Sequence, residues 1–306
     1  MTLFLLESIH KEIIIPNANV TVTIKRDDLI HPIISGNKYL KLKYNLLEAN
    51  KLKTKTILTF GGAFSNHILA VAAAGKENGF STIGIIRGEE LSDKVAMNPT
   101  LQKAQDYGMN LNFVTRDDYR LKDSKIFFNN LKKNFGDFYL LPEGGTNELA
   151  IKGCEEIVSL KEKEFDFICC SVGTGGTISG VINSSERNQK ILGFPSLKGD
   201  FLQQDICKFV QKTNWKLIND YHFGGYGKVT EELILFINQF YVTYKIPLDP
   251  IYTGKMFFGV FDLINKNWFP INSKILLIHT GGIQGVEGMN NLLRQKKQLE
   301  IKIDET

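Results

Sequence analysis

Short apolar runs alternate with amphipathic stretches along the chain, and this alternation predicts its order of strands and helices. Apolar or alternating runs predict strands at residues 20–25, 56–60, 81–86, 111–114, 165–171, 191–193 and 274–279. Helical periodicity predicts helices at residues 38–49, 66–78, 99–107, 123–134, 149–161, 177–184 and from about 285 onward. Because strands alternate with helices, we expect an α/β fold of two domains, each a mostly parallel twisted sheet flanked by helices.

Two turn-rich segments mark where the chain is expected to cross between these domains. Residues 142–147 read Pro-Glu-Gly-Gly-Thr-Asn, and a second turn lies at residues 35–37. One domain inserted into the other fits this pattern. We therefore predict a large domain of residues 1–43 plus 146–306 and an inserted small domain of residues 44–145.

The composition is that of an ordinary globular protein, with 43% hydrophobic and 23% charged residues. The 37 basic and 33 acidic residues are spread along the chain and give a net charge of +4, so no nucleic-acid partner is expected. No run is long enough for a membrane span, and the apolar patch at residues 3–6 is too short for a signal peptide. We expect a cytoplasmic protein.

Cysteine usage gives no sign of a disulfide framework or of a metal site. The four cysteines are Cys154, Cys169, Cys170 and Cys207, and none forms a Cys-x-x-Cys pair. Cys169 and Cys170 lie in an apolar run, where free cysteines pack as small hydrophobic residues.

A glycine-rich loop follows the apolar run at residues 165–171. It reads Gly173-Thr174-Gly175-Gly176-Thr177 and leads into a predicted helix. Glycines let backbone N–H groups converge on one point, and the helix start adds its dipole, so the loop is a candidate phosphate-binding site. It is not a Walker loop, and Ile178 stands where a dinucleotide-binding loop has its third glycine. The alternative is a plain glycine turn.

Lys38 follows the Ser35-Gly36-Asn37 turn at the start of a predicted helix. Lys41 is three residues further on and shares one helix face with it. A neighbouring positive charge and partial burial would lower the pKa of a lysine and favour attack on a carbonyl. Lys41 is the second candidate for this covalent role, and the alternative for both is a surface lysine on an amphipathic helix.

Ser65-Asn66-His67 follows the Gly61-Gly62 turn and precedes an alanine-rich helix. Serine and asparagine favour such a position as helix caps. The same position offers free N–H donors to a carboxylate. The two interpretations are compatible.

Other candidates lie at the end of the last predicted strand and beside glycines. Thr280 follows the strand at residues 274–279, and strand ends line the ligand crevice in doubly wound folds. Tyr226 and Tyr252 lie near glycines, for which ordinary packing is the alternative. His279 is interpreted as a packed histidine.

Taken together, these motifs resemble one family of enzymes. The family contains D-cysteine desulfhydrase and 1-aminocyclopropane-1-carboxylate deaminase, which depend on pyridoxal 5'-phosphate and have the tryptophan synthase β-like fold (fold type II). The resemblance spans most of the chain and rests on six motifs in order, at residues 25–28, 36–38, 61–67, 172–177, 249–255 and 279–282.

The resemblance implies a role for each candidate residue. Lys38 resembles the lysine that holds the cofactor covalently and acts as base at Cα. Ser65 and the N–H groups beside it, including those of Asn66 and His67, resemble the substrate carboxylate site. Tyr226 and Tyr252 resemble substrate-facing catalytic tyrosines. The remaining cofactor contacts implied are Asn66 at the phenolic oxygen, Gly173, Thr174, Gly175, Gly176 and Thr177 at the phosphate, and Thr280 at the pyridine nitrogen.

Two positions in the substrate region depart from patterns in this family. Ring-opening deaminases carry Glu where Thr253 stands, and Thr253 matches the desulfhydrase-like pattern. Both named enzymes usually carry Gln where Phe64 stands, so Phe64 replaces a hydrogen-bond donor beside Ser65 with an apolar ring. The segment after Tyr226 also lacks the usual Pro-Asn.

The resemblance therefore implies a lyase for a small amino acid. The first expectation is D-cysteine desulfhydrase-like α,β-elimination that yields pyruvate, ammonia and sulfide. The enzymatic alternatives are 1-aminocyclopropane-1-carboxylate deamination and elimination from D-serine or β-chloroalanine. A further alternative is a protein that binds the cofactor without catalysis. A homodimer is expected from the resemblance.

Overall fold

The computed structural model describes residues 7–303, so the apolar patch at residues 3–6 lies outside the described residues. The strands are β1 (Ile9–Ile13), β2 (Thr21–Arg26), β3 (Thr56–Gly61), β4 (Ser81–Arg87), β5 (Met109–Val114), β6 (Tyr139–Leu141), β7 (Phe167–Val172), β8 (Lys190–Pro195), β9 (Trp215–Leu217) and β10 (Lys274–Ile278). The helices are α1 (Asn37–Lys51), α2 (Asn66–Asn78), α3 (Pro99–Asp106), α4 (Arg116–Arg120), α5 (Lys125–Phe135), α6 (Glu148–Cys154), α7 (Gly176–Ser184), α8 (Phe201–Cys207), α9 (Glu231–Tyr244), α10 (Thr253–Asn265) and α11 (Gly285–Gln295).

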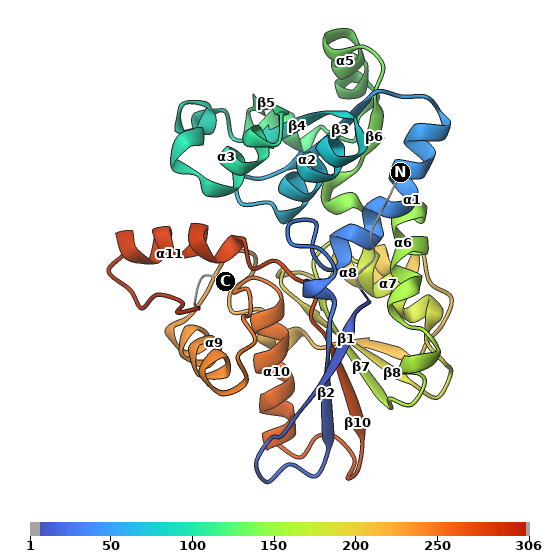
Figure 1. Cartoon of the computed structure of the whole chain (residues 1–306), viewed down its shortest axis with the longest axis vertical. Helices are drawn as coiled ribbons and strands as arrows, with labels where there is room; N and C mark the ends of the chain where they lie inside the picture. The colour runs from blue at the N-terminus through green and yellow to red at the C-terminus, as the bar shows by residue number, and fades with distance from the viewer. Residues whose placement is uncertain (1–6, 304–306) are drawn as a thin grey trace.

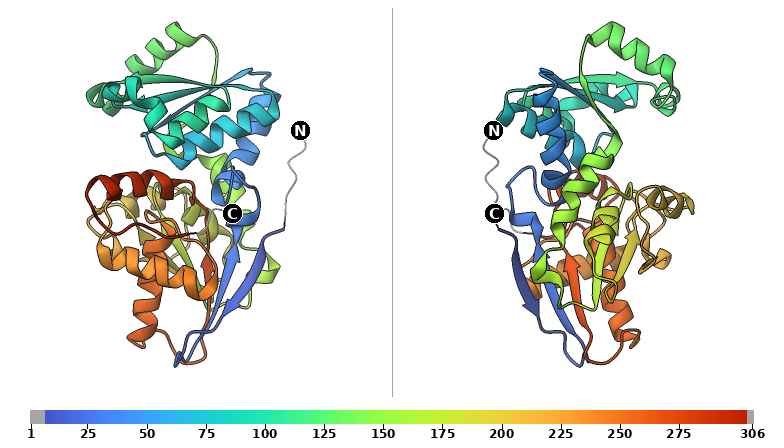
Figure 2. Two further views of the ribbon diagram at one scale, coloured as in Figure 1. Left: turned by 60° about the vertical axis from the view of Figure 1, so that its left-hand side comes forward. Right: turned by 90° about the vertical axis from the view of Figure 1, so that its right-hand side faces the viewer.

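The strands form two sheets, which lie one above the other in Figures 1 and 2. The six-stranded sheet has the order β1-β2-β10-β7-β8-β9 and is parallel except for β1, which pairs antiparallel with β2. The four-stranded sheet has the order β5-β4-β3-β6 and is parallel throughout. The predicted α/β fold is confirmed. The domain bounds at residues 43/44 and 145/146 stay a proposal, which the insertion of β3–β6 between β2 and β7 supports.

Helix α2 begins and ends where the sequence predicts, because both ends carry strong signals. The hydroxyl of Ser65 accepts a hydrogen bond from the Ile68 N–H at 3.4 Å and caps the first turn. Gly79 ends the helix in the left-handed conformation at φ 73°. The alanine-rich body between them is buried against the neighbouring strands.

The predicted helix at residues 149–161 is wrong in length. Helix α6 ends at Cys154, and two short 3-10 turns follow it. The second turn has its own capping box, in which Ser159 and Glu162 bond each other's backbone or side chain. The capping box at Ser159 thus starts a new helical turn and interrupts the helix predicted for residues 149–161.

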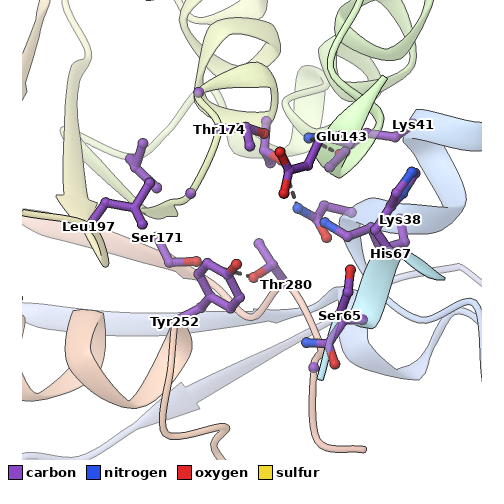
Figure 3. Close-up of a pocket in the computed structure, with 18 of the residues that line it drawn as sticks. Lys38, Lys41, Ser65, His67, Glu143, Ser171, Thr174, Leu197, Tyr252 and Thr280 are labelled. Atoms are coloured by element: carbon purple, nitrogen blue, oxygen red, sulfur yellow. Dashed lines mark hydrogen bonds between the residues drawn. The ribbon is translucent and has the colours of Figure 1, made fainter. Parts of the chain in front are cut away.

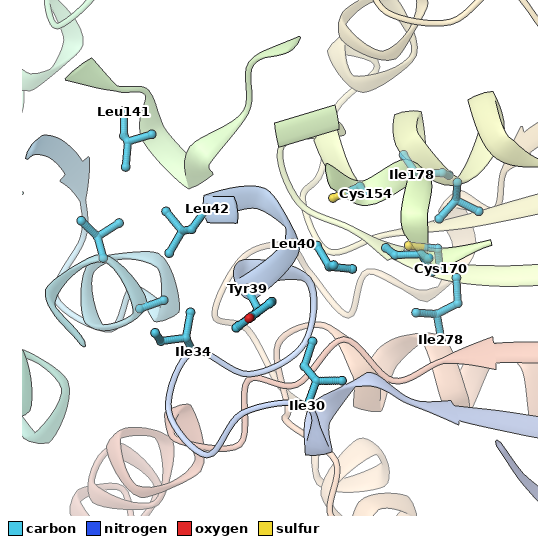
Figure 4. Packing of buried hydrophobic residues seen from close by; sticks show 14 of the residues in the cluster. Ile30, Ile34, Tyr39, Leu40, Leu42, Leu141, Cys154, Cys170, Ile178 and Ile278 are labelled. Atoms are coloured by element: carbon cyan, nitrogen blue, oxygen red, sulfur yellow. The ribbon is translucent and has the colours of Figure 1, made fainter. Parts of the chain in front are cut away.

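One hydrophobic core joins the two sheets. Tyr39, Leu40 and Leu42 of α1 pack in the same buried cluster as Leu141 of the four-stranded sheet and Ile278 of the six-stranded sheet (Figure 4). Helix α1 therefore links both halves rather than covering one face of a single sheet. Within residues 7–303, none of the helices combines the length and apolarity that a membrane crossing requires.

Close packing brings the start of α1 against the loop that follows β10. Gly36 has φ +62°, and a Cβ placed on it would collide with the carbonyl of Thr280. Only glycine accommodates both the backbone conformation and the approach. Lys38 and Thr280 are therefore held near each other although they are far apart in the sequence.

Candidate active site

A cavity of about 540 Å³ lies where the carboxyl ends of both sheets meet. The loops after β3, β7 and β10 and the ends of β4 and β6 supply its walls. Parallel strands point their carboxyl ends in one direction, so polar side chains of distant segments converge there. In Figure 3, Lys38 lies beside His67, across the cavity from Tyr252 and Ser171.

Lys38 lines this cavity and is the strongest candidate nucleophile. Burial, together with the positive charge of Lys41, lowers its pKa from the ordinary 10.5 to about 7. About half of Lys38 is consequently neutral at pH 7, as a nucleophile or base requires.

Lys41 is positioned for a different task. Its Nζ donates to the carbonyl oxygen of Gly144 at 3.0 Å and to the Oγ1 of Thr146 at 3.2 Å. Thr146 in turn is hydrogen-bonded to Thr174 at 2.6 Å. Lys41 thus lies behind the glycine-rich loop, where its amino group would lie near an anion held by that loop.

The Gly173–Thr177 loop connects β7 to α7 as predicted. Gly175 adopts a left-handed conformation at φ +83°. The Oγ1 of Thr177 accepts a hydrogen bond from the Nδ2 of Asn37 at 2.7 Å, which ties the loop to the start of α1. The loop therefore presents helix-start N–H groups and hydroxyls to the cavity.

The start of α2 contributes Ser65, Asn66 and His67 to the cavity wall. Asn66 lies at the first position of α2, and its side-chain Oδ1 is buried without a hydrogen-bond partner among the described residues. An unpaired buried amide is costly, so Asn66 is a group that a ligand would satisfy.

The imidazole of His67 is neutral and is bound to the protein interior. Its Nε2 lies 2.8 Å from the Oγ1 of Thr59, whose proton is donated to the Leu141 carbonyl at 3.0 Å. Nε2 must therefore carry the imidazole hydrogen. Burial, together with the charges of Lys38 and Lys41, lowers the pKa of His67 well below its usual value.

Thr280 lines the cavity, and its hydroxyl meets that of Ser171 at 3.2 Å. His279 is buried and packed, as expected: its Nε2 donates to the Pro247 carbonyl at 2.7 Å. Its Nδ1 accepts from the Gly281 N–H at 3.2 Å. These contacts fix the turn that carries Thr280.

Tyr226 and Tyr252 form the wall opposite Lys38. Their rings meet edge to face with centroids 6.3 Å apart. Burial raises the pKa of both phenols above the usual 10. Both tyrosines are therefore neutral hydrogen-bond donors at physiological pH.

Phe64 and Thr253, expected to contact substrate, do not line the cavity. The ring of Phe64 packs over Gly288 of α11. Thr253 is 0% exposed, and its hydroxyl donates to Asp249 Oδ1 at 2.6 Å. Asp249 also accepts from the backbone N–H groups of residues 251–253, so Thr253 belongs to a buried cap at the start of α10.

Three charged residues line the cavity from the four-stranded side without having been predicted from the sequence: Arg87, Lys122 and Glu143. Lys122 lies 3.6 Å from the carboxylate of Glu143. Arg87 ends β4 beside Gly62 and packs over the Tyr119 ring, and no carboxylate of the described chain pairs with it. The signal in the sequence that could have identified them was their position near the ends of parallel strands.

Comparisons with known proteins point to one family of enzymes. Residues 12–281 match the family model described as "Pyridoxal-phosphate dependent enzyme". The chain is 33% identical over 282 residues to a Pyrococcus horikoshii protein named "Putative 1-aminocyclopropane-1-carboxylate deaminase", covering 86% of this chain and 85% of that protein. It is 29% identical over 311 residues to the mitochondrial "Bifunctional D-cysteine desulfhydrase/1-aminocyclopropane-1-carboxylate deaminase" of Arabidopsis thaliana, covering 91% and 77%. A solved structure of an "ACC deaminase homologue" matches with a TM-score of 0.81 and 29% identity, over 96% of this chain and 95% of that one.

Proposed function

The chain belongs to the family of pyridoxal-phosphate dependent enzymes, and we propose that it is a lyase that releases sulfide from D-cysteine. The family, the cofactor and the fold type inferred from the sequence motifs are confirmed by the family model and by the structural match. The relatives include lyases named for D-cysteine and for 1-aminocyclopropane-1-carboxylate, so the choice between these substrates is the part that we propose.

The cavity residues fit pyridoxal 5'-phosphate at each of its functional groups. The Gly173–Thr177 loop and Lys41 would hold the phosphate, and the unpartnered amide of Asn66 would bond the phenolic oxygen. Thr280 would meet the pyridine nitrogen, and Lys38 would hold the aldehyde carbon covalently. The unpaired side-chain amide of Asn66 is the observation that carries this fit: its oxygen has no described partner, and its Nδ2 is the donor that would bond the phenolic oxygen.

When bound, the cofactor supplies an electron sink for negative charge at Cα of an amino acid. Lys38, released from the cofactor when the amino group of the substrate takes its place, would take the Cα proton as general base, as its pKa near 7 allows. Ser65 and the first N–H groups of α2 bind the carboxylate and so orient Cα. The neutral Tyr252 and Tyr226 donate hydrogen bonds to the side chain that departs.

The overall reaction converts D-cysteine and water into pyruvate, ammonia and hydrogen sulfide. Support for this substrate comes from the start of α10, where the cavity wall carries a phenol and no carboxylate. Thr253 stands where ring-opening deaminases have Glu, and its hydroxyl is used within the protein by Asp249. The part of the wall that α10 supplies is therefore neutral, in contrast to the side with Arg87, Lys122 and Glu143, and a neutral contact suits a thiol side chain.

A titration of the cofactor-loaded protein with D-cysteine tests the proposal. We expect the visible absorption of the lysine-bound cofactor to shift while sulfide appears in the same cuvette. An unchanged spectrum and no sulfide would remove D-cysteine as substrate.

Deamination of 1-aminocyclopropane-1-carboxylate is the second candidate, because the relatives with the highest identities reported above carry that name. The same titration with that compound distinguishes the two activities, since ring opening releases ammonia without sulfide. D-serine and β-chloroalanine extend the test to other leaving groups. A homodimer and a cytoplasmic location are further proposals, which gel filtration with light scattering and cell fractionation would test.

A further inference from the structure

Lys255 is a buried lysine whose hydrogen bonds all go to one loop beside the cavity. It lies in the first turn of α10 and is 1% exposed. Its Nζ donates to the carbonyl oxygens of His222 at 2.9 Å and Gly225 at 2.8 Å. Within the described part of the chain, Lys255 forms no ion pair with a carboxylate. The ammonium group therefore contacts backbone alone.

The loop that Lys255 contacts spans residues 222–227 and is strained and rich in glycine. Phe223 has φ 52°, and Gly224, Gly225 and Gly227 have φ +89°, +111° and +67°. Four left-handed residues within such a short segment carry a large entropic cost of ordering. No strand pairing involves this loop. Turn hydrogen bonds to His222 and the packing of Phe223 on Phe258 hold its first half, and the Lys255 ammonium group adds two bonds, one of them to Gly225 next to Tyr226.

The residue that the loop presents to the cavity is Tyr226, which is 42% exposed and meets Tyr252 edge to face. Tyr252 lies three residues before Lys255 in the chain. The start of α10 therefore controls both tyrosines, Tyr252 directly and Tyr226 through the loop. We propose that Lys255 is a positioning residue whose ammonium group holds the 222–227 loop so that Tyr226 faces the substrate side chain.

Stability alone does not explain a charged group at this position. Burial lowers the pKa of Lys255 to about 8, which reflects the cost of charging it there. A methionine would fill similar space without this cost. The His222 carbonyl also accepts from the Gly225 N–H at 3.0 Å, and the Gly225 carbonyl from the Lys228 N–H at 3.2 Å. Neither acceptor would be left unpaired without Lys255, so the fold should tolerate its loss.

A double-mutant cycle in the cofactor-loaded enzyme tests this inference, which rests on the proposed lyase function. We expect Lys255→Met and Tyr226→Phe each to lower kcat/KM by about 10-fold or more. The double variant should be no worse than the poorer single variant, because Lys255 acts through Tyr226. If the kcat/KM losses of the two single variants multiplied in the double variant, the proposal would be overturned. Lys255→Gln keeps two N–H donors and should recover part of the loss.

Controls separate positioning from general damage. Lys266→Met changes an exposed lysine at the other end of α10, paired with Asp262 at 2.6 Å, and should leave kcat/KM unchanged. The visible absorption of bound cofactor should be the same in Lys255→Met as in the unaltered enzyme. A lost band would place Lys255 in cofactor binding and refute the positioning role.

A second measurement keeps the inference testable if no substrate turns over. Hydrogen exchange of the backbone amides at residues 223–228 should become at least about 10-fold faster in Lys255→Met, while amides of α10 keep their protection. Failure of the lyase proposal would leave this result intact. Unchanged exchange in the loop would overturn the inference by itself.

Discussion

Two glycine-rich loops border the same cavity, and they are held in place by different means. The loop at residues 173–177 joins a central strand to a helix and is tied by Asn37 and Thr146 through hydroxyl hydrogen bonds. The loop at residues 222–227 has four left-handed residues, and it is held by turn hydrogen bonds to His222, by the packing of Phe223 on Phe258 and by the buried ammonium group of Lys255. The loop proposed to hold the cofactor is thus built onto a central strand, whereas the loop proposed to face the substrate depends on single side chains.

The largest effect is expected where both ends meet, at Lys38. Lys38→Ala removes the only covalent anchor proposed for the cofactor together with the proposed base, so kcat should fall about a thousandfold or more. The visible band of lysine-bound cofactor should also disappear. Lys43→Ala on the same helix, where Lys43 pairs with Glu156 at the surface, is the matched control. If Lys38→Ala retained its turnover, the covalent and base roles would have to be assigned to another residue.

Alanine at Gly176 should damage the cofactor end selectively. Its Cβ would lie 2.8 Å from the Oγ1 of Thr146 and 3.2 Å from the Nζ of Lys41. Overpacking of this kind costs about 1–3 kcal/mol, so the cofactor Kd should rise about 10- to 100-fold. Gly227→Ala, in the other loop, meets nothing within 4 Å and should leave cofactor affinity unchanged. Equal losses of cofactor affinity in Gly176→Ala and Gly227→Ala would show that the two loops do not differ in this respect.

The pH dependence of cofactor attachment tests the role proposed for Lys38. With a pKa near 7, Lys38 is about 10% neutral at pH 6 and about 90% neutral at pH 8. Attachment to the apoprotein, followed by absorbance in stopped flow, should therefore rise about ninefold between these values and then level off. A rate still climbing tenfold per unit at pH 9 would mean that Lys38 keeps its ordinary pKa.

The same shift has a consequence for stability of the apoprotein. The folded pKa lies below the ordinary 10.5, so charging Lys38 is harder in the folded state. Its contribution to the free energy of unfolding is favourable above pH 10.5 and is lost as the pH falls through 7. Lys38→Met should accordingly stabilise the apoprotein at pH 6, as measured by urea unfolding.

The smallest effect is expected at the substrate end, from Arg87. Its exposed guanidinium lacks a carboxylate partner in the described chain and attracts an anionic group by long-range charge. Arg87→Met should raise KM about 2- to 5-fold, and the difference should shrink at high salt. Arg116→Met removes another exposed arginine, paired with Glu90, and should leave KM as it was. A changed kcat with constant KM would contradict this role.

The sequence was informative where structure follows from local signals. The bounds of α2 could be predicted because Ser65 and Gly79 are strong cap residues. Helices α9 and α10 were missed because apolar residues occur on most of their faces, which hides the helical period. Strand β9 has three residues, too few for a pattern, and the edge strand β1 exposes four of its five residues, so it has no apolar face to detect.

For the site residues too, prediction succeeded where local motifs were sufficient and failed where the fold had to be known. Lys38, Thr280 and the loop at residues 173–177 were found as motifs, and all of them except Gly176 line the cavity as expected. Arg87 and Glu143 were missed because only the pairing of β4 and β6 with β3 brings them to the loop after β3. Phe64 and Thr253 lie beside site residues in sequence, but their side chains point to α11 and to Asp249. Sequence adjacency does not determine side-chain direction.

The central position of β10 in the six-stranded sheet has a consequence for the order of folding. It pairs with β2 and with β7. Strand β2 can therefore form its parallel pairing only after β10 has been synthesised, more than two hundred residues later. The four-stranded sheet, whose strands follow one another between residues 56 and 141, needs no such delay. During synthesis the nascent chain should therefore complete one half early and gain its cofactor pocket only at the end. Pulse-labelled exchange during refolding would refute this order if β10 became protected before β3.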